Sequence, residues 1–509
     1  MRRARSFAAV FDLPSSTETP LDWRTIVTAQ CFAMCSIAST TAVYAIGFFM
    51  ARRFDEKASE SELAFRAGAL AAAKPMASAL SAYPWGRLGD AWSFEGAIAC
   101  TAVAHAMATL GFATAGDTAG AFAWRLAQGA VDGMAVLQKP ALALVSDGTN
   151  AARAFATTGV AYGVASAFSP ALAAALAEPC ENWAVYKDDA TKCPGFLKAR
   201  PFFLANAWVS AMCLVPLAMW FVGWMEIDKH REVENGEVEE GVVAELALLS
   251  SDETTEKGSS EVGSVATVSK GESPWWRDAN VRAAIVSQVG CTFVVLTGAE
   301  MTPVWMATSY DNGGLSFSSV EIGAFGSLMG VAILSFQVFL FTRLTRKYGI
   351  VSLLTKALLV NAVTFPLHPI AHLALKKSKE VAWMIIVVLG IARGMSGPII
   401  MGGSSLILNN ASPRKTLGAV NGFSGMFGNF GRGVAPLIGG ALIAMMVSMG
   451  PNTFGRDFWP FIAIGIGFCS LTILSRRLSP DLNRPRDEKR RMRTDSRRDS
   501  ASEGDLSEL

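Results

Sequence analysis

Twelve long apolar stretches, separated by polar segments, constrain this 509-residue chain more than any other feature. A helix needs roughly 20 apolar residues to cross the hydrocarbon core, because backbone polar groups in lipid must be satisfied within the segment. Charged residues make up only 17% of the chain, whereas soluble domains carry about 25%. The sequence therefore predicts an all-α membrane protein with twelve transmembrane helices, near 25–50, 63–85, 96–115, 119–146, 154–177, 201–225, 281–308, 319–342, 350–374, 381–410, 418–449 and 458–478.

The spans fall into two blocks of six, which predicts two six-helix bundles joined by a linker. The linker holds 14 acidic and 5 basic residues, a composition typical of disorder. Lysine and arginine are in excess on the side of the two tails, mainly through the C-terminal tail, so we expect both termini in the cytoplasm. The basic N-terminus lacks the apolar run of a signal peptide, which favours a short tail over an organelle-targeting segment. The predicted organisation is 1–24 N-terminal tail, 25–225 first bundle, 226–280 cytoplasmic linker, 281–478 second bundle and 479–509 C-terminal tail.

The two halves resemble each other at a few positions. Arg125 lies in the first half and Arg393 lies 268 positions later, and Gly and Pro are eleven residues apart both in Gly159…Pro170 and in Gly425…Pro436. Secondary transporters use such repeats and bind substrate near mid-membrane at the repeat interface. Pro170 and Pro436 are therefore candidate hinges, although close helix packing by small residues explains the same pattern.

Seven ionisable residues lie within the predicted spans. Each uncompensated charge at a helix centre costs about 2.5–3.5 kcal/mol on insertion scales, so these side chains must pair with one another or face a water-filled cavity. Positive charges outnumber negative ones, which favours anionic or zwitterionic cargo. The seven are Lys74, Arg125, Asp132, Lys139, Glu300, Arg393 and Arg432.

The predicted helix 119–146 carries three of these charges at intervals of seven residues. On one continuous helix Arg125, Asp132 and Lys139 drift only about 20° per interval and share a stripe, and Gln128 lies close to it. Such a stripe is typical of a cavity lining, and a buried network between helices is the alternative.

Glu300 is the first candidate for proton coupling and Asp132 the second. Burial and nearby cations act in opposite directions on proton binding by a carboxyl group, so a buried acid near arginine can load and release a proton. Each acid could instead be a permanent partner of an arginine or lysine.

Cysteines and histidines predict a disulfide but no metal site. Cys180 and Cys193 share the loop after the fifth span, and an oxidising compartment would allow them to pair. His368 and His372 are four residues apart, but Pro369 lies between them and no carboxylate is near in sequence. The chain has no P-loop, no HExxH and no nucleophile elbow. ATP-driven pumping and a membrane enzyme are therefore disfavoured, and no cofactor is expected.

Several motifs carry a family resemblance over about 25–478. They are YPWGRLGDAW (83–92), the fourth-helix residues Arg125 and Lys139, GVAYGVASAFSPALAAAL (159–176), Glu300 with the later VWMATSYDNGGLSFSSVEIG, and LILNNASPRKTLGAVNGFSG followed by Arg432 and Pro436. With these motifs the chain resembles the major facilitator superfamily, especially its drug:proton antiporter branch and zinc-induced facilitator-like carriers. The resemblance implies proton-coupled export or compartment loading of small organic or metal-linked solutes. It also implies a gating loop at 83–92, with Gly86 and Asp90 at its matched positions.

The chain departs from this family pattern at several positions. Ala91 and Ser93-Phe94-Glu95 stand where basic residues usually follow Asp90, so Arg87 is the candidate to supply the missing charge. Asp132 stands where Asn is usual, and Lys74 has no recognised counterpart. These departures make the transfer of a substrate from named relatives unsafe.

The sequence as a whole predicts a proton-coupled secondary transporter of a small solute that works by alternating access. An uncoupled facilitator, or a nutrient receptor built on a transporter fold, is the alternative. We expect a monomer in the plasma membrane or a vacuole-type membrane, with no nucleic-acid partner.

Overall fold

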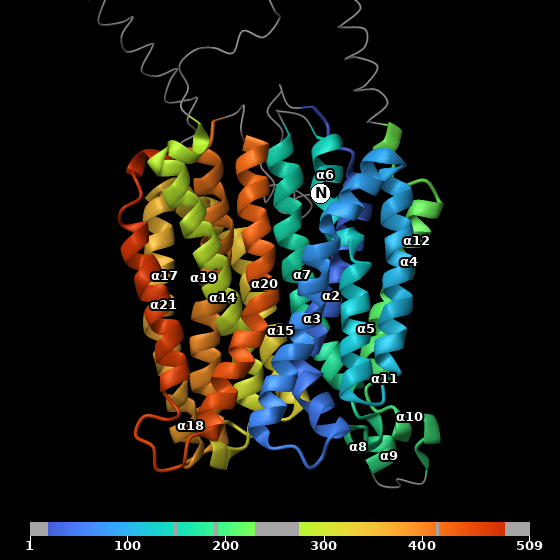
Figure 1. Cartoon of the computed structure of the whole chain (residues 1–509), viewed down its shortest axis with the longest axis vertical. Helices are drawn as coiled ribbons and strands as arrows, with labels where there is room; N and C mark the ends of the chain where they lie inside the picture. The colour runs from blue at the N-terminus through green and yellow to red at the C-terminus, as the bar shows by residue number, and fades with distance from the viewer. Residues whose placement is uncertain (1–18, 147–149, 188–191, 230–273, 414–416, 484–509) are drawn as a thin grey trace, which may run out of the picture.

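The computed structural model describes residues 19–146, 150–187, 192–229, 274–413 and 417–483, which form a bundle of long, upright helices (Figure 1). Within these residues, nine helical segments are long and apolar enough to cross a membrane. Three further crossings are α3 (Glu60–Ala91), which carries several charged residues, the broken pair α5 (Thr118–Ala130) and α6 (Gly133–Leu144), and the shorter α21 (Trp459–Ser475). The predicted all-helical fold is confirmed.

Six crossings build each half of the molecule. The first half contains α3, α5 with α6, α2 (Trp23–Phe54), α4 (Phe94–Ala113), α7 (Ala151–Leu176), and α11 (Phe203–Met212) with α12 (Leu214–Phe221). The second contains α14 (Ala279–Ala307), α15 (Ser319–Phe339), α17 (Ile350–Leu367) with α18 (Pro369–Leu375), α19 (Lys379–Ala411), α20 (Leu417–Ser448) and α21, with the short α16 (Phe341–Tyr348) between α15 and α17. We call the end of the bundle where α2 starts and α21 ends the terminal face, at the top of Figure 1, and the opposite end the loop face.

Two predicted elements differ from the structure. The span 119–146 is not one helix, because α5 ends at Ala130 and α6 begins at Gly133, so the continuous stripe predicted for its charges is wrong. The predicted gating loop 83–92 is helical almost to its end, since α3 continues to Ala91. The Trp85 indole donates to the Ala130 carbonyl at 2.7 Å and ties this end of α3 to the break between α5 and α6.

The two halves meet along two seams, α7 with α15 and α3 with α20 (Figure 1). A Cβ atom on Gly323 would lie 2.7 Å from the Pro170 carbonyl oxygen, and one on Gly68 would lie 2.6 Å from that of Pro436. Each candidate hinge proline therefore presses against a glycine of the other bundle. Only residues without a side chain permit this approach of two backbones.

The bundles are bonded to each other at the loop face. Glu60, at the start of α3, accepts hydrogen bonds from the Ser309 backbone N–H at 2.9 Å, from its hydroxyl at 3.0 Å and from the Asn312 amide at 3.2 Å. The Ser61 hydroxyl donates to the Ala444 carbonyl at 3.0 Å. Toward the terminal face, Cβ atoms on Gly425 and Gly428 of α20 would meet no neighbour within 4 Å. The structure is closed at the loop face.

The loop after α7 contains α8 (Pro179–Asn182), α9 (Ala184–Lys187) and α10 (Gly195–Ala199), low in Figure 1. Cys180 and Cys193 are disulfide-bonded there, with Cα atoms 5.6 Å apart. Most of the predicted linker and C-terminal tail lies outside the described residues.

Candidate functional site

A buried ion pair holds the break between α5 and α6. The Lys74 ammonium lies 3.0 Å from Asp132 Oδ2, and both side chains are almost fully buried. Lys74 also donates to the Ser39 hydroxyl at 2.7 Å, and the Ser36 hydroxyl donates to Asp132 Oδ2 at 2.7 Å. The pair joins α2, α3 and the start of α6 within the first bundle. Asp132 is thus a partner of lysine, the alternative that its sequence left open.

Arg125 lies on α5 and is fully buried without an acidic hydrogen-bond partner among the described residues. Its guanidinium donates to the carbonyl oxygens of Leu70 at 3.1 Å and Ser39 at 3.0 Å, and to Gln128 Oε1 at 2.8 Å. Gln128 in turn donates to the Thr109 hydroxyl at 3.0 Å. The cation is held by neutral oxygens, so its position is fixed while its charge is not neutralised by a bonded carboxylate.

Glu300 brings a carboxyl group from the second bundle to this cation. It lies on α14 and is 7% exposed. Its carboxyl lies close to the hydroxyl of Tyr44 on α2, and both Tyr44 and Arg125 are near enough to interact with it electrostatically. Within the described residues Glu300 is in no salt bridge. The contact crosses from the second bundle to the first.

Arg393 on α19 is the counterpart in the second bundle, and its surroundings are neutral. It donates to the Thr302 hydroxyl at 3.0 Å and to His368 Nε2 at 3.1 Å, and it lies 4.1 Å from the Phe365 ring centroid. His368 Nδ1 lies 2.9 Å from the Thr364 carbonyl and must donate to it, so Nε2 is the acceptor. The His368 ring stacks on Phe461, with the two planes 7° apart.

The structure brings together some predicted residues and leaves others apart. Arg125, Gln128, Asp132 and Glu300 gather between α2, α5, α6 and α14, whereas Arg393 has its own cluster. Arg432 and Arg87 are exposed, and Gly86 is half-buried at the end of α3. The side chains of Asp90 and Lys139 lie outside what the structure describes.

Sequence reasoning missed two residues of the site. Tyr44 sits in an apolar helix with no charge around it in sequence, so only its contact with the other bundle reveals it. His368 has no metal-binding pattern around it in the sequence. Its position between Pro366 and Pro369, at the break between α17 and α18, was the signal available. Proline at these positions interrupts the helical hydrogen bonds.

Comparisons with known proteins agree on the class of protein. The chain matches the Major Facilitator Superfamily over residues 26–436. It is 23% identical over 438 residues to a probable peptide/nitrate transporter of Arabidopsis thaliana, covering 84% of this chain and 85% of that one.

Solved structures share the fold at low sequence identity. A D-xylose–proton symporter superposes with a TM-score of 0.63 at 11% identity, covering 92% of this chain and 100% of that chain. The human organic anion transporter MFSD10 gives 0.55 at 15% identity, covering 90% and 100%. The match over most of the sequence, with twelve crossings in two bundles, makes this chain a multi-pass membrane transporter of the Major Facilitator Superfamily rather than an enzyme.

Proposed function

We propose that the chain couples proton movement to transport of a small solute carrying an anionic group. The observation that carries this proposal is Glu300, a buried carboxyl that crosses the bundle interface to Tyr44 and interacts with Arg125. An ionised carboxyl in a low-dielectric interior is stabilised only by such partners. Gain or loss of one proton at Glu300 therefore changes the attraction between the two bundles.

Alternating access follows from this arrangement. With Glu300 ionised, its attraction to Arg125 and its interaction with Tyr44 hold α14 against the first bundle. When Glu300 takes up a proton, the attraction to Arg125 falls and the bundles are freer to rock along the α3–α20 and α7–α15 seams. The Glu60 bonds at the loop face then form the gate that must open, and Glu60 is an addition to the gating residues expected from the sequence. In this proposal the terminal face is cytoplasmic.

Two buried arginines support an anionic group on the cargo. Neither Arg125 nor Arg393 has an acidic hydrogen-bond partner among the described residues, and both are held by neutral oxygen or nitrogen acceptors. A carboxylate or a similar group supplies the charge that these sites lack. The Arabidopsis relative named for peptide or nitrate, and the fold neighbour named for organic anions, are consistent with such cargo. Exchange against protons, as in the drug:proton antiporters the sequence resembles, is the direction we propose.

The test is transport by purified protein in liposomes containing a trapped pH dye. Organic anions, zwitterions, metal chelates, potassium and cationic drugs are added in turn to wild type, Glu300→Gln and Tyr44→Phe. A matched control is Glu380→Gln, which removes an exposed carboxylate at the start of α19. We expect an anion-dependent proton flux in wild type and in the control, none in Glu300→Gln, and an altered pH profile in Tyr44→Phe.

Other outcomes would overturn parts of the proposal. Proton flux that persists in Glu300→Gln would remove this residue as the carrier of the proton. Uptake of a labelled solute without proton flux in wild type would make the protein an uncoupled facilitator. Flux driven only by cationic drugs would overturn the anionic cargo. Failure of every solute with folded protein would favour the receptor alternative.

A further inference from the structure

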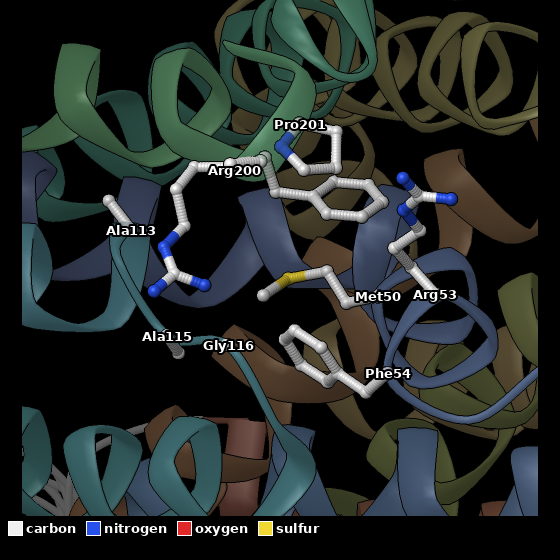
Figure 2. A pocket seen from close by; sticks show the side chains of 10 residues that line it. Met50, Arg53, Phe54, Ala113, Ala115, Gly116, Arg200 and Pro201 are labelled. Carbon is white, nitrogen blue, oxygen red and sulfur yellow. The ribbon is translucent and has the colours of Figure 1, made fainter. Parts of the chain in front are cut away.

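A small basic pocket opens at the loop face of the first bundle, apart from the site described above. It is a cavity of ≈ 90 Å³ lined by the end of α2, the connection between α4 and α5, and the segment that joins α10 to α11. Two of its lining residues are arginines, Arg53 and Arg200, and none is acidic among those described. Figure 2 shows Arg200 reaching toward Ala113 and Ala115 on one side, Arg53 on the other, and Met50 and Phe54 between them.

Arg200 is the more informative of the two cations. It ends α10, is half-buried, and makes no side-chain hydrogen bond or ion pair with any part of the chain that the structure describes. Its guanidinium lies against the backbone of Gly116, where a Cβ atom would be only 2.5 Å from Nη1. The glycine therefore leaves room for an arginine head, partly open to water, whose five N–H donors lack a protein acceptor.

Arg53 adds charge that two acids, its partner Glu56 and the nearby Glu178, only partly offset. It pairs with Glu56 at 3.3 Å, but both side chains are largely exposed, and exposed pairs of this kind contribute little. Met50, Phe54 and Phe202 form apolar walls. A guanidinium beside apolar walls is less screened by water than one on an open surface, so it attracts an anion more strongly.

The walls of the pocket are held in place from outside. The Glu178 N–H donates to the carbonyl oxygen of Pro201, a lining residue, at 2.8 Å. Two residues further on, Cys180 is disulfide-bonded to Cys193, close in sequence to α10. The loop that presents Arg200 is thus tied at two points, and a site built on it is preorganised.

The volume of the pocket limits the size of the ligand that it can bind. Drug-sized molecules occupy pockets of about 300–1,000 Å³. A cavity of ≈ 90 Å³ therefore suits a group of a few heavy atoms. Tetrahedral oxyanions match the forked donors of arginine.

We propose that this pocket binds a single phosphate-type oxyanion, either free in solution or as the headgroup of an anionic phospholipid. Arg200 is its principal ligand and Arg53 the second. The bound anion would tie α2, the α4–α5 connection and α10 together at the loop face and so stabilise the first bundle.

The experiment follows thermal unfolding of the full chain by tryptophan fluorescence. Detergent-purified protein is titrated with sodium phosphate or sodium sulfate against sodium chloride of equal ionic strength. A second arm compares nanodiscs of phosphatidylcholine with and without phosphatidic acid. The variants are Arg200→Gln, Arg200→Lys and the matched control Lys198→Gln, which removes an exposed charge from the same loop outside the pocket.

We expect a saturable rise in melting temperature for wild type and Lys198→Gln. Arg200→Gln should lower the apparent affinity at least about tenfold, because it removes charge-assisted hydrogen bonds. Arg200→Lys should fall between them, since it keeps the charge and loses the fork, and it guards against a glutamine variant that fails to fold. A response to phosphatidic acid alone assigns the headgroup, and a response to phosphate or sulfate assigns the free ion.

No response to any anion, or an equal response in Arg200→Gln and wild type, would overturn the proposal. Loss of the response in Lys198→Gln as well would show that general surface charge is responsible. None of these readouts measures transport, so the result is independent of the function proposed above.

Discussion

Each bundle buries one arginine at a corresponding position of the repeat, and the two arginines have different surroundings. Arg125 lies near the Lys74–Asp132 ion pair and the Glu300 carboxyl of the other bundle. Arg393 lies against Phe365 and a neutral His368. The first environment contains two carboxyl groups, whereas none contacts Arg393 among the residues that the structure describes. In our proposal both arginines attract the anionic group of the cargo, and only the arginine of the first bundle also takes part in proton coupling.

The largest effect should come from breaking the ion pair. Lys74→Met leaves Asp132 buried without its cation, and we expect the free energy of unfolding to fall by about 3–5 kcal/mol. Adding Asp132→Asn removes the second charge and should recover most of the loss. The measurement is unfolding in mixed micelles, with Lys379→Met as control because its pair with Glu321 is largely exposed on the lysine side. If Lys74→Met alone is as stable as wild type, Asp132 does not need Lys74 for its burial.

The next prediction tests the division between the two arginines. Arg393→Lys loses the guanidinium face on Phe365 and the planar head that reaches both Thr302 and the Gly298 carbonyl, which costs about 1–3 kcal/mol in affinity for an anionic solute. We expect kcat/KM to fall about tenfold or more with the pH profile unchanged. Arg125→Lys should instead shift the pH profile, because Arg125 interacts with Glu300. Equal shifts of the pH profile in both variants would remove the distinction.

A smaller effect should follow from His368→Phe. The new ring can stack on Phe461 as His368 does, but the acceptor for Arg393 is lost. One missing hydrogen bond to a charged group costs about 1.5–3 kcal/mol, and local relaxation or water should keep the loss at the low end. Solute affinity should fall while proton coupling persists. If affinity is unchanged, His368 does not orient Arg393.

The smallest predicted effect lies outside the membrane spans, at Glu178. Burial, then the neighbouring Glu181, raises the pKa of its carboxyl to about 7, against the opposing effect of Arg53 and Arg52. The folded protein then keeps this proton up to about pH 7, whereas an unfolded chain releases it near pH 4.5. The free energy of unfolding should therefore decrease as pH rises from 4.5 to 7.

Glu178→Gln removes that dependence and should stabilise the protein at pH 8, by an amount on the order of 1 kcal/mol after allowance for solvent. Thermal melts of wild type and variant between pH 5 and pH 8 measure it. Parallel pH profiles for the two proteins would contradict the assignment. Such an effect at the loop face should leave both arginine clusters unchanged.

The fold could be predicted from the sequence because every span must be apolar over the length needed to cross the lipid. Hydrophobic length alone located the twelve crossings, and the spacing of Pro170 and Pro436 indicated the repeat. The local course of the chain was less well predicted where contacts between distant parts of the sequence determine it. The helix is interrupted at Asp132, whose carboxylate pairs with Lys74 of α3 at the turn between α5 and α6.

The candidate site could be predicted only in part. Glu300 and the two arginines were found because a charge in a span is costly, but Tyr44 and His368 carry no such signal. The same limit applies to His372, which had no carboxylate nearby in sequence. Its Nε2 lies 3.9 Å from Asp457 Oδ2, a residue far along the chain.

The proline–glycine contacts between the two bundles limit which substitutions this protein tolerates. Pro170 of the first bundle presses on Gly323 of the second, and Pro436 of the second presses on Gly68 of the first. A methyl group at either glycine would collide with backbone, which cannot move aside as a flexible side chain can. A survey of all single substitutions should therefore find two kinds of intolerant position. One kind is the uncharged small residues along the α7–α15 and α3–α20 seams, and the other is the buried ionisable residues.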